Sequence, residues 1–282
     1  MALFIAIVSA IGWFVGEYYF EGAGFSFVGF ALIFAGISSF VSYYHSDKIV
    51  LAISRAKEVK ESDNQYLYRL VENLCIGAGL PKPKIYMIED SAMNAFATGR
   101  DPEHAVMCFT SGIVEGLEKL ELEGVIAHEL CHIGNYDIRL MSIVSVLVGT
   151  VTLLADLFTR GIFYGGGRRR GKSSGGGGVL LVAGLILVIL SPIIAQLIKL
   201  AVGRKREFLA DASAALLTRY PDGLAGALRK ISMDRETLEV ANGATAHLYI
   251  ANPLKGRGKG GIANLLNTHP PVDERIKRLE DM

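Results

Sequence analysis

The amino-acid sequence predicts a mainly helical integral membrane protein, with four hydrophobic helices and a water-exposed α+β portion that contains a small sheet. Three observations predict this fold class. The chain of 282 residues is 51% apolar and has a mean hydropathy of +0.35, which favours a membrane protein. Four apolar runs approach the roughly 20 residues that a helix needs to cross a bilayer core. Between the second and third runs, the apolar residues change from a helical period to that of short strands.

The first two runs predict an N-terminal transmembrane hairpin over residues 1–45. The first run covers residues 2–20 and is interrupted by Glu17, and the second covers residues 22–44 without a formal charge. The glycine-rich segment 21–24 predicts a tight turn between them. Because the start of the chain lacks the basic region and cleavage site of a signal peptide, we expect the first run to be retained.

The other two runs predict a second hairpin over residues 140–202. They cover residues 140–159 and 179–198, and the Gly/Arg-rich stretch between them is typical of a flexible linker. Small residues suit close packing of membrane helices. Those on the four runs include Gly24, Gly29, Gly36, Gly149 and Gly184.

Two groups of basic residues predict opposite orientations of the chain in the membrane. A basic segment at residues 48–60 follows the second run, whereas the first hairpin loop carries only an acid, so the positive-inside rule places residues 45–139 in the cytoplasm. Arg168, Arg169, Arg170 and Lys172 lie in the loop of the second hairpin, which four full spans would place outside. We follow the first hairpin; the alternative is that the third and fourth runs form a shallow or kinked hairpin.

Residues 46–139 predict the first part of the water-exposed domain. A helix is expected over residues 47–80, ending at the glycines before Pro81. Three strands are then expected at residues 84–88, 94–98 and 105–110, forming a small sheet. The helical pattern returns over residues 112–139 and is expected to run straight on towards the third apolar run.

This last helix carries the segment His128-Glu129-Leu130-Cys131-His132. Residues four apart share a helix face, so His128 and His132 can bind one metal ion with Glu129 beside them. A catalytic zinc takes three protein ligands and keeps one position for water, for which Glu129 would be the general base. From these five residues alone, the alternative is two surface histidines on an amphipathic helix.

The cysteine count and the net charge argue against a disulfide-stabilised protein and against a nucleic-acid-binding protein. The odd count of three cysteines, Cys75, Cys108 and Cys131, predicts no disulfide framework and favours a reducing compartment. We interpret Cys131 as a small buried apolar residue, with a redox role or a role beside the metal as the alternative. The formal net charge of +1 gives no support to a nucleic-acid partner.

A third metal ligand is expected after the fourth run, where an antiparallel hairpin returns the chain to the same membrane surface. Glu207 and Asp211 lie four apart on one helix face there, so one can bind metal while the other orients a ligand or a nearby arginine. Glu207 lies about as far past the membrane as His132 lies before it, roughly 12 Å by helix rise. The alternative is a solvated charged helix start.

Several longer motifs extend this pattern over nearly the whole chain. They are residues 127–132 with Asn135 and Asp137, residues 206–211, residues 244–254, the Thr-His-Pro-Pro segment 268–271, and residues 94–99. Together with two apolar runs on each side of the His-Glu-x-x-His segment, they resemble the HtpX family of membrane zinc metallopeptidases, which are relatives of the CAAX prenyl endopeptidases.

The resemblance implies one zinc ion per chain, bound by His128, His132 and Glu207, with Glu129 as general base. It also implies a zincin-like peptidase domain that faces the cytoplasm and is built from residues 46–139 and 203–282. His269 resembles a family histidine near the zinc, where it could stabilise the oxyanion. The alternative is a turn residue held by two prolines.

Substrate contacts are expected on the predicted sheet. If the strand at residues 105–110 is an edge, Ala105, Val106, Met107 and Cys108 could pair with an extended substrate through main-chain hydrogen bonds. Asn94 could fix the backbone of that peptide. Plain sheet packing is the alternative for both.

We therefore predict a membrane-anchored zinc endopeptidase of the cell membrane that cleaves membrane or misfolded polypeptides in quality control and stress response. A non-catalytic zinc-stabilised scaffold or chaperone is the alternative, and it would need the three ligands but not Glu129. A transporter would need several polar residues along the spans, where only Glu17 and Asp156 stand, both near run ends.

Overall fold

The computed structural model describes residues 2–19, 22–147, 149, 203–241, 245–253 and 270–282. The chain divides into two units, residues 1–44 with 146–196 and residues 45–145 with 197–282. Each unit is therefore made of two separate stretches of sequence. Nearly all of the predicted second hairpin, and His269, lie outside the described residues.

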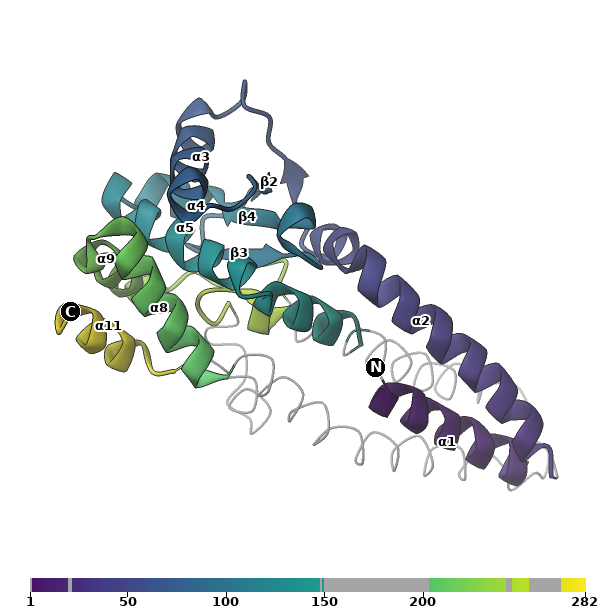
Figure 1. Cartoon of the computed structure of the whole chain (residues 1–282). Helices are drawn as coiled ribbons and strands as arrows, with labels where there is room; N and C mark the ends of the chain where they lie inside the picture. The colour runs from purple at the N-terminus through teal and green to yellow at the C-terminus, as the bar shows by residue number, and fades with distance from the viewer. Residues whose placement is uncertain (1, 20–21, 148, 150–202, 242–244, 254–269) are drawn as a thin grey trace, which may run out of the picture. The chain divides into compact units, whose positions relative to one another are not determined.

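An α-helical hairpin begins the chain, formed by α1 (Ala2–Tyr19) and α2 (Gly24–Ile53) (Figure 1). A Cβ atom added at Gly12 of α1 would lie 2.6 Å from the Cβ of Ala31, and one at Gly16 would lie 2.8 Å from the Cβ of Phe27. The two backbones approach closely at these small residues, as is usual between membrane helices.

Three of the glycines that we expected to suit close helix packing, Gly24, Gly29 and Gly36, lie on α2. A Cβ added at Gly29 or Gly36 would meet no described atom within 4 Å, so these two glycines do not form the contact between α1 and α2. At Gly24, an added Cβ would lie 2.9 Å from the ring of Trp13. Small residues thus do allow the close approach of α1 and α2, but the contact lies mainly at Gly12 and Gly16, which were not named from the sequence.

Among the described helices, only α2 is long and apolar enough to cross a bilayer. Between Phe25 and Phe40 its large exposed side chains are apolar, as lipid contact requires, and they include Ile33 and Ile37. The first run forms the helix α1 but does not meet the same criterion. Four complete spans remain a prediction, because most of residues 140–159 and all of 179–198 are not described.

The helix expected over residues 47–80 is two helices separated by a short strand. The first, α2, ends at Ile53, strand β1 covers Lys57–Glu58, and α3 covers Gln65–Ala78. The side chain of Asn64 accepts a hydrogen bond from the Leu67 amide and so begins α3. The prediction of one continuous helix was wrong because this cap and the turn before it interrupt the chain.

The sheet contains β2 (Lys84–Ile88), β3 (Ala95–Thr98) and β4 (Val106–Thr110) besides β1, in the order β1-β2-β4-β3. The three predicted strands are confirmed. Strand β4 pairs in parallel with β2 on one side and antiparallel with β3 on the other. It is therefore a central strand, and the expectation of an edge at residues 105–110 was wrong.

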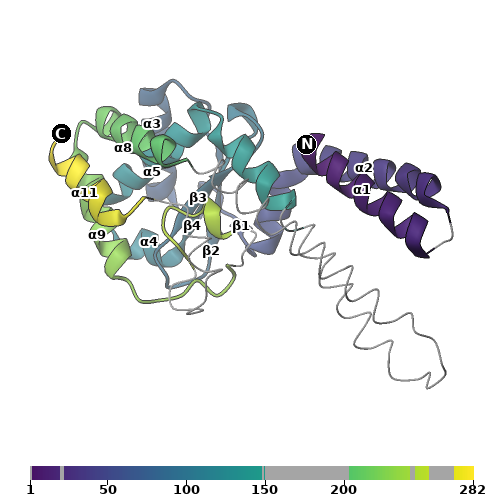
Figure 2. The same cartoon turned by 90° about the horizontal axis from the view of Figure 1, so that it is seen from below.

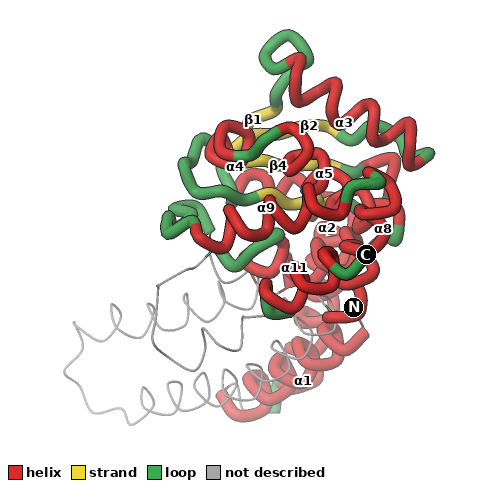
Figure 3. Tube along the Cα trace, turned by 90° about the vertical axis from the view of Figure 1, so that its left-hand side faces the viewer, coloured by secondary structure: helices red, strands yellow, loops and turns green. Residues whose placement is uncertain are grey.

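Helix α5 (Lys119–Gly134) is the centre of the second unit and is buried along most of its length. It packs against α3, α8 (Arg204–Thr218) and α9 (Pro221–Met233), and it also contacts β3. Helices α8, α9 and α11 (Val272–Glu280) lie side by side (Figure 2, Figure 3). The shorter helices are α4 (Ser111–Gly116), η1 (Pro102–His104) and η2 (Ala246–Leu248).

The chain does not continue straight from α5 towards the third apolar run. Helix α5 ends at Gly134, residues 135–136 form a turn, and helical structure resumes over residues 137–147. Tyr136 has a φ of 59°, in the left-handed region that breaks a right-handed helix. The expected continuous helix was therefore wrong, and the 12 Å estimate by helix rise does not apply.

Candidate metal centre

The two histidines of the His-Glu-x-x-His segment lie on one face of α5 and are buried. Their Nε2 atoms are 3.1 Å apart. The helix repeat explains this proximity, because residues four apart stand one above the other. The alternative of two solvated surface histidines is wrong, since His128 and His132 are among the least exposed polar side chains of the described chain.

Glu207 approaches both histidines from α8. Its Oε1 atom is 3.5 Å from His132 Nε2, and its Oε2 atom is 3.9 Å from His128 Nε2. One ligand atom from each of the three residues lies within 4.8 Å of the other two, and all three residues are buried. Two imidazole nitrogens and one carboxylate oxygen are a donor set that suits a catalytic zinc, so the group could hold this ion.

Each histidine is held from behind by a carboxylate. The Nδ1 atom of His128 is 3.0 Å from Asp211 Oδ1, and the Nδ1 atom of His132 is 3.0 Å from Asp137 Oδ2. An N–H donated to a carboxylate at Nδ1 leaves the Nε2 lone pair for a metal. Of the two acids on α8, Glu207 faces both histidines, as the assignment by resemblance expects of the third ligand, and Asp211 lies behind His128.

The turn after α5 makes one of these contacts possible. Asp137 follows His132 by five residues and would lie on another face if the helix continued. The turn at residues 135–136 brings its carboxylate back to the His132 ring. The same helix break that contradicts the expected continuous helix therefore completes the centre.

Two arginines in the centre were not identified from the sequence. Arg206 contacts Asp137, and Arg275 donates to both carboxylate oxygens of Asp211 through Nε and Nη2. Arg275 comes from α11, far along the chain. A clue was available, because Arg275 lies four residues before Leu279 on the apolar face of an amphipathic helix.

Glu129 is buried beside the histidines and accepts a hydrogen bond from the main chain of Ala97 in β3. Burial disfavours its charged form and raises its pKa to about 7, with the nearby Glu207 acting in the same direction. A carboxylate with a pKa near neutrality is suited to accept and return a proton.

The two imidazoles differ in their proton affinity. Burial lowers the pKa of His128. Burial also opposes the charge on His132, but its contacts with Asp137 and Glu207 outweigh that effect and raise its pKa to about 10. Because only a neutral imidazole binds a metal ion, loading the centre would release the proton held by His132.

The remaining predicted site residues lie elsewhere. Asn94 is buried, and its amide donates to the Ala251 carbonyl at 3.0 Å while its Oδ1 atom accepts from the Ala95 amide at 3.1 Å. It thus joins the start of β3 to a neighbouring segment. Val106, Met107 and Cys108 pair with β2 and β3 on both sides, and Ala105, just before β4, accepts from the Lys84 amide, so they offer no free strand edge and their expected role was wrong. His269 is not described.

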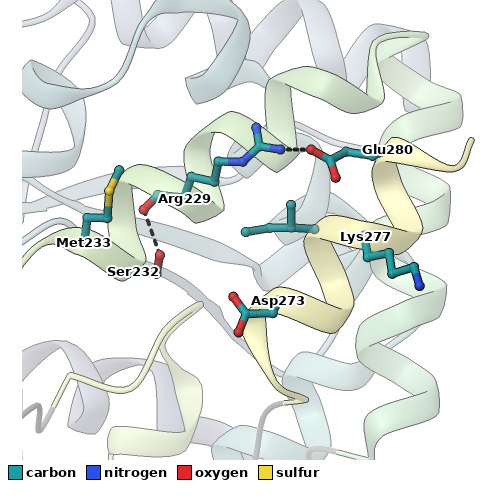
Figure 4. Close-up of a pocket in the computed structure, with 7 residues that line it drawn as sticks. Arg229, Ser232, Met233, Asp273, Lys277 and Glu280 are labelled. Atoms are coloured by element: carbon teal, nitrogen blue, oxygen red, sulfur yellow. Dashed lines mark hydrogen bonds and ion pairs between the residues drawn. The ribbon is translucent and has the colours of Figure 1, made fainter.

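One pocket lies apart from this centre, between α9 and α11 (Figure 4). None of the predicted site residues lines it. It is bordered by an ion pair between Arg229 and Glu280, and its lining residues are Arg229, Ser232, Met233, Asp273, Ile276, Lys277 and Glu280.

A helix-borne histidine pair, a carboxylate from a second helix and a buried glutamate beside a sheet strand are features of metallopeptidases. Residues 61–282 match the family model described as "Peptidase family M48". The chain belongs to this family. It is a membrane-associated metalloprotease, and a non-catalytic scaffold is not favoured.

Relatives of the chain carry the name "Protease HtpX homolog". One from Dictyoglomus thermophilum is 47% identical over 268 residues, which cover 94% of this chain and 84% of the relative. Others from Tropheryma whipplei and Listeria monocytogenes are 43% and 44% identical, and each alignment covers 99% of this chain and at least 92% of the relative. The resemblance to HtpX proteases that the motifs predict is confirmed.

A solved structure shares the fold. The crystal structure of S. mikatae Ste24p matches with a TM-score of 0.54 at 18% identity, covering 98% of this chain and 62% of Ste24p. The chain thus spans about three fifths of the length of that protein.

Proposed function

We propose that the chain is a zinc endopeptidase in which His128, His132 and Glu207 bind one zinc ion and Glu129 is the general base. The observation that carries this proposal is the buried group of three ligand atoms within 4.8 Å of one another. Glu129 adjoins one of these ligands in the sequence and is buried with them. The membership of peptidase family M48 supports the same reaction.

The residues of the centre have separate roles in the proposed hydrolysis of a peptide bond. A zinc ion held by His128, His132 and Glu207 would polarise the substrate carbonyl and lower the pKa of the attacking water. Asp211 and Asp137 keep the Nδ1 protons in place, so the Nε2 atoms of both histidines stay directed to the centre. Glu129 accepts the proton of the water and passes it to the leaving amine. The Ala97 amide orients Glu129 for this transfer.

We propose β3 as the strand that binds an extended substrate. Within the described part of the sheet, β3 pairs only with β4 and leaves its other side open to pairing. The Ala95 carbonyl on that side already accepts a hydrogen bond from the Ile250 amide at 3.0 Å, and the Ala97 amide donates to Glu129, so a substrate would pair with the other main-chain groups of this edge, beside Glu129. Main-chain pairing there would hold a peptide flat beside the centre without demanding a sequence.

The substrates that we propose are membrane or misfolded polypeptides at the cell membrane, cleaved in quality control. Helix α2 could anchor the chain in the bilayer, and the basic residues after it favour a peptidase domain in the cytoplasm. The multi-pass topology with two hairpins, and His269 as a donor to the oxyanion, belong to the same proposal.

The test compares cleavage of a loosely folded membrane protein by detergent-purified wild type, Glu129→Gln and the control Glu123→Gln, which lies on the same helix. We expect Glu129→Gln to retain zinc and to lose about 10²-fold to 10⁴-fold in rate, the usual contribution of a general base. The control and the wild type should both lose activity to a zinc chelator. Cleavage by Glu129→Gln at the wild-type rate would contradict the mechanism.

A further inference from the structure

Helix α11 is fixed to the second unit by one face. Leu279 is buried in the core, and Ile276 packs against it. On the outer side, Glu280 forms an ion pair with Arg229 of α9, while Asp273 and Lys277 border the pocket (Figure 4). The buried face also carries a charged residue, Arg275, which is only 1% exposed. A buried guanidinium is costly unless its charge and its N–H groups are all matched.

The contacts of Arg275 match its donors closely. Its Nε atom donates to Asp211 Oδ2 at 2.8 Å, and its Nη2 atom donates to Asp211 Oδ1 at 2.7 Å. Its Nη1 atom donates to the Ile250 carbonyl at 3.3 Å. The paired contact uses the planar fork of the guanidinium, which a lysine ammonium cannot reproduce.

The same group reaches the metal centre by three routes: through Asp211, through Glu207, and by its Nη2 atom, which lies 3.5 Å from His128 Nδ1. Asp211 Oδ1, which accepts from Arg275, is also 3.0 Å from His128 Nδ1. Independently, Arg275 Nη1 lies 3.5 Å from Glu207 Oε2, the oxygen that faces His128. One guanidinium therefore holds the partner of one ligand and directly contacts another.

The charges give this arrangement a physical reason. Glu207 and Asp211 are buried carboxylates one helical turn apart on α8, and like charges this close repel each other. The positive charge of Arg275 contacts both and offsets the repulsion. The two acids can then stay close together, with Glu207 facing the histidines and Asp211 against His128 Nδ1.

We propose that Arg275 is a positioning residue of the metal centre, which makes α11 part of the zinc site. It locks Asp211 against His128 and holds Glu207 by charge, so the two ligands are oriented before metal arrives. This inference rests on the proposed assignment of His128, His132 and Glu207 as zinc ligands.

The test measures zinc affinity of the full-length protein in detergent, by titration against a competing chromophoric chelator. Arg275→Met loses the charge and the fork, and Arg275→Lys keeps the charge alone. The matched control is Arg278→Met, because Arg278 is on the same helix but its side chain is 54% exposed. We expect Arg275→Met to bind zinc about 10-fold to 100-fold more weakly, as is usual when a partner of a metal ligand is lost. Arg275→Lys should fall between, and the control should match the wild type.

A second pair of measurements separates positioning from a purely structural role. The visible spectrum of the Co²⁺-loaded protein reports the ligand geometry, and thermal unfolding of the metal-free protein reports the fold. Positioning predicts an altered Co²⁺ spectrum in both Arg275 variants. It also predicts that Asp211→Asn and Arg275→Met together weaken zinc binding by less than the sum of their separate effects on its free energy.

The outcomes are distinguishable. If metal-free Arg275 variants unfold at lower temperature but bind zinc and Co²⁺ like the wild type, Arg275 is only structural and the inference is overturned. If Arg275→Met does not fold, Arg275→Lys decides by the same two readouts. If the wild type itself does not take up about one zinc per chain, the proposed function fails and not the role of Arg275 alone.

Discussion

The two histidines of the centre are supported in different ways. His128 is held by Asp211, which Arg275 binds in the interior, where its side chain is 1% exposed. His132 is held by Asp137, which contacts Arg206, whose side chain is 44% exposed. The first support is closed off from water, and the second reaches solvent. Water screens charges and can replace a lost partner. Loss of the buried support of His128 is therefore expected to destabilise the fold more than loss of the support of His132, while the two losses should affect the orientation of the metal ligands more equally.

The largest effect on zinc binding is expected from Glu207, which faces both histidines. Glu207→Ala removes the carboxylate that faces both histidines and leaves two protein ligands. We expect the variant to lose nearly all zinc after purification and to lose cleavage with it. Metal analysis of the purified protein is the measurement. Full zinc occupancy in Glu207→Ala would place the third ligand elsewhere.

The next effect compares the two carboxylates directly. Asp211→Asn removes the carboxylate that accepts two hydrogen bonds from the buried Arg275 and leaves it the longer contact with Glu207; breaking a buried pair typically costs about 3–5 kcal/mol of stability. Asp137→Asn leaves Arg206, which can turn to water, so we expect a much smaller loss of stability. Both changes should weaken zinc binding, each by about 10-fold to 100-fold.

Denaturant unfolding of the metal-free variants and a zinc titration check this pair. Equal losses of stability in Asp211→Asn and Asp137→Asn would show that burial of the arginine does not distinguish the two supports. Unequal losses with equal effects on zinc affinity would confirm the comparison.

A smaller effect is expected from pH on the metal-free protein. Burial alone would raise the pKa of Asp211, but its contacts with His128 and Arg275 outweigh this and lower the pKa to about 2. A lowered folded-state pKa stabilises the fold above the ordinary value of 3.8, and this contribution is lost as the pH falls towards about 2. The difference in unfolding free energy between wild type and Asp211→Asn should therefore be constant above about pH 5 and shrink below it. A difference that does not change down to pH 2 would contradict the assignment.

The smallest effect on stability and zinc affinity is expected from Arg206, the solvent-exposed partner of Asp137. Arg206→Gln removes an ion pair whose arginine is open to water, and such pairs contribute at most about 1 kcal/mol. Zinc affinity should fall by less than about tenfold, the factor that about 1.4 kcal/mol represents. A loss as large as that expected for Arg275→Met would remove the distinction between the two supports.

Two features of the fold, the break after α5 and the strand order of the sheet, were not predicted from the sequence. The break of α5 at residues 135–136 follows Gly134 and Asn135, residue types that often end a helix, but the apolar pattern continues past them, and Tyr136 takes the left-handed conformation. The order of the sheet was equally hidden, because alternation of apolar residues identifies a strand but not its neighbours. Strand β4 is central because β2 and β3 pair with its two sides, and this is a long-range choice.

The sequence by itself determined the apolar N-terminal helices, the three strands near the motif and the helical His128-Glu129-x-x-His132 pair, because helix and strand periods are local properties. The resemblance carried by its motifs also implied Glu207 as the third ligand. Only the tertiary structure brought Asp137 back to His132 and placed Arg275 against Asp211. Those contacts join residues of different helices and of a turn, so they depend on how the elements pack and not on spacing along the chain.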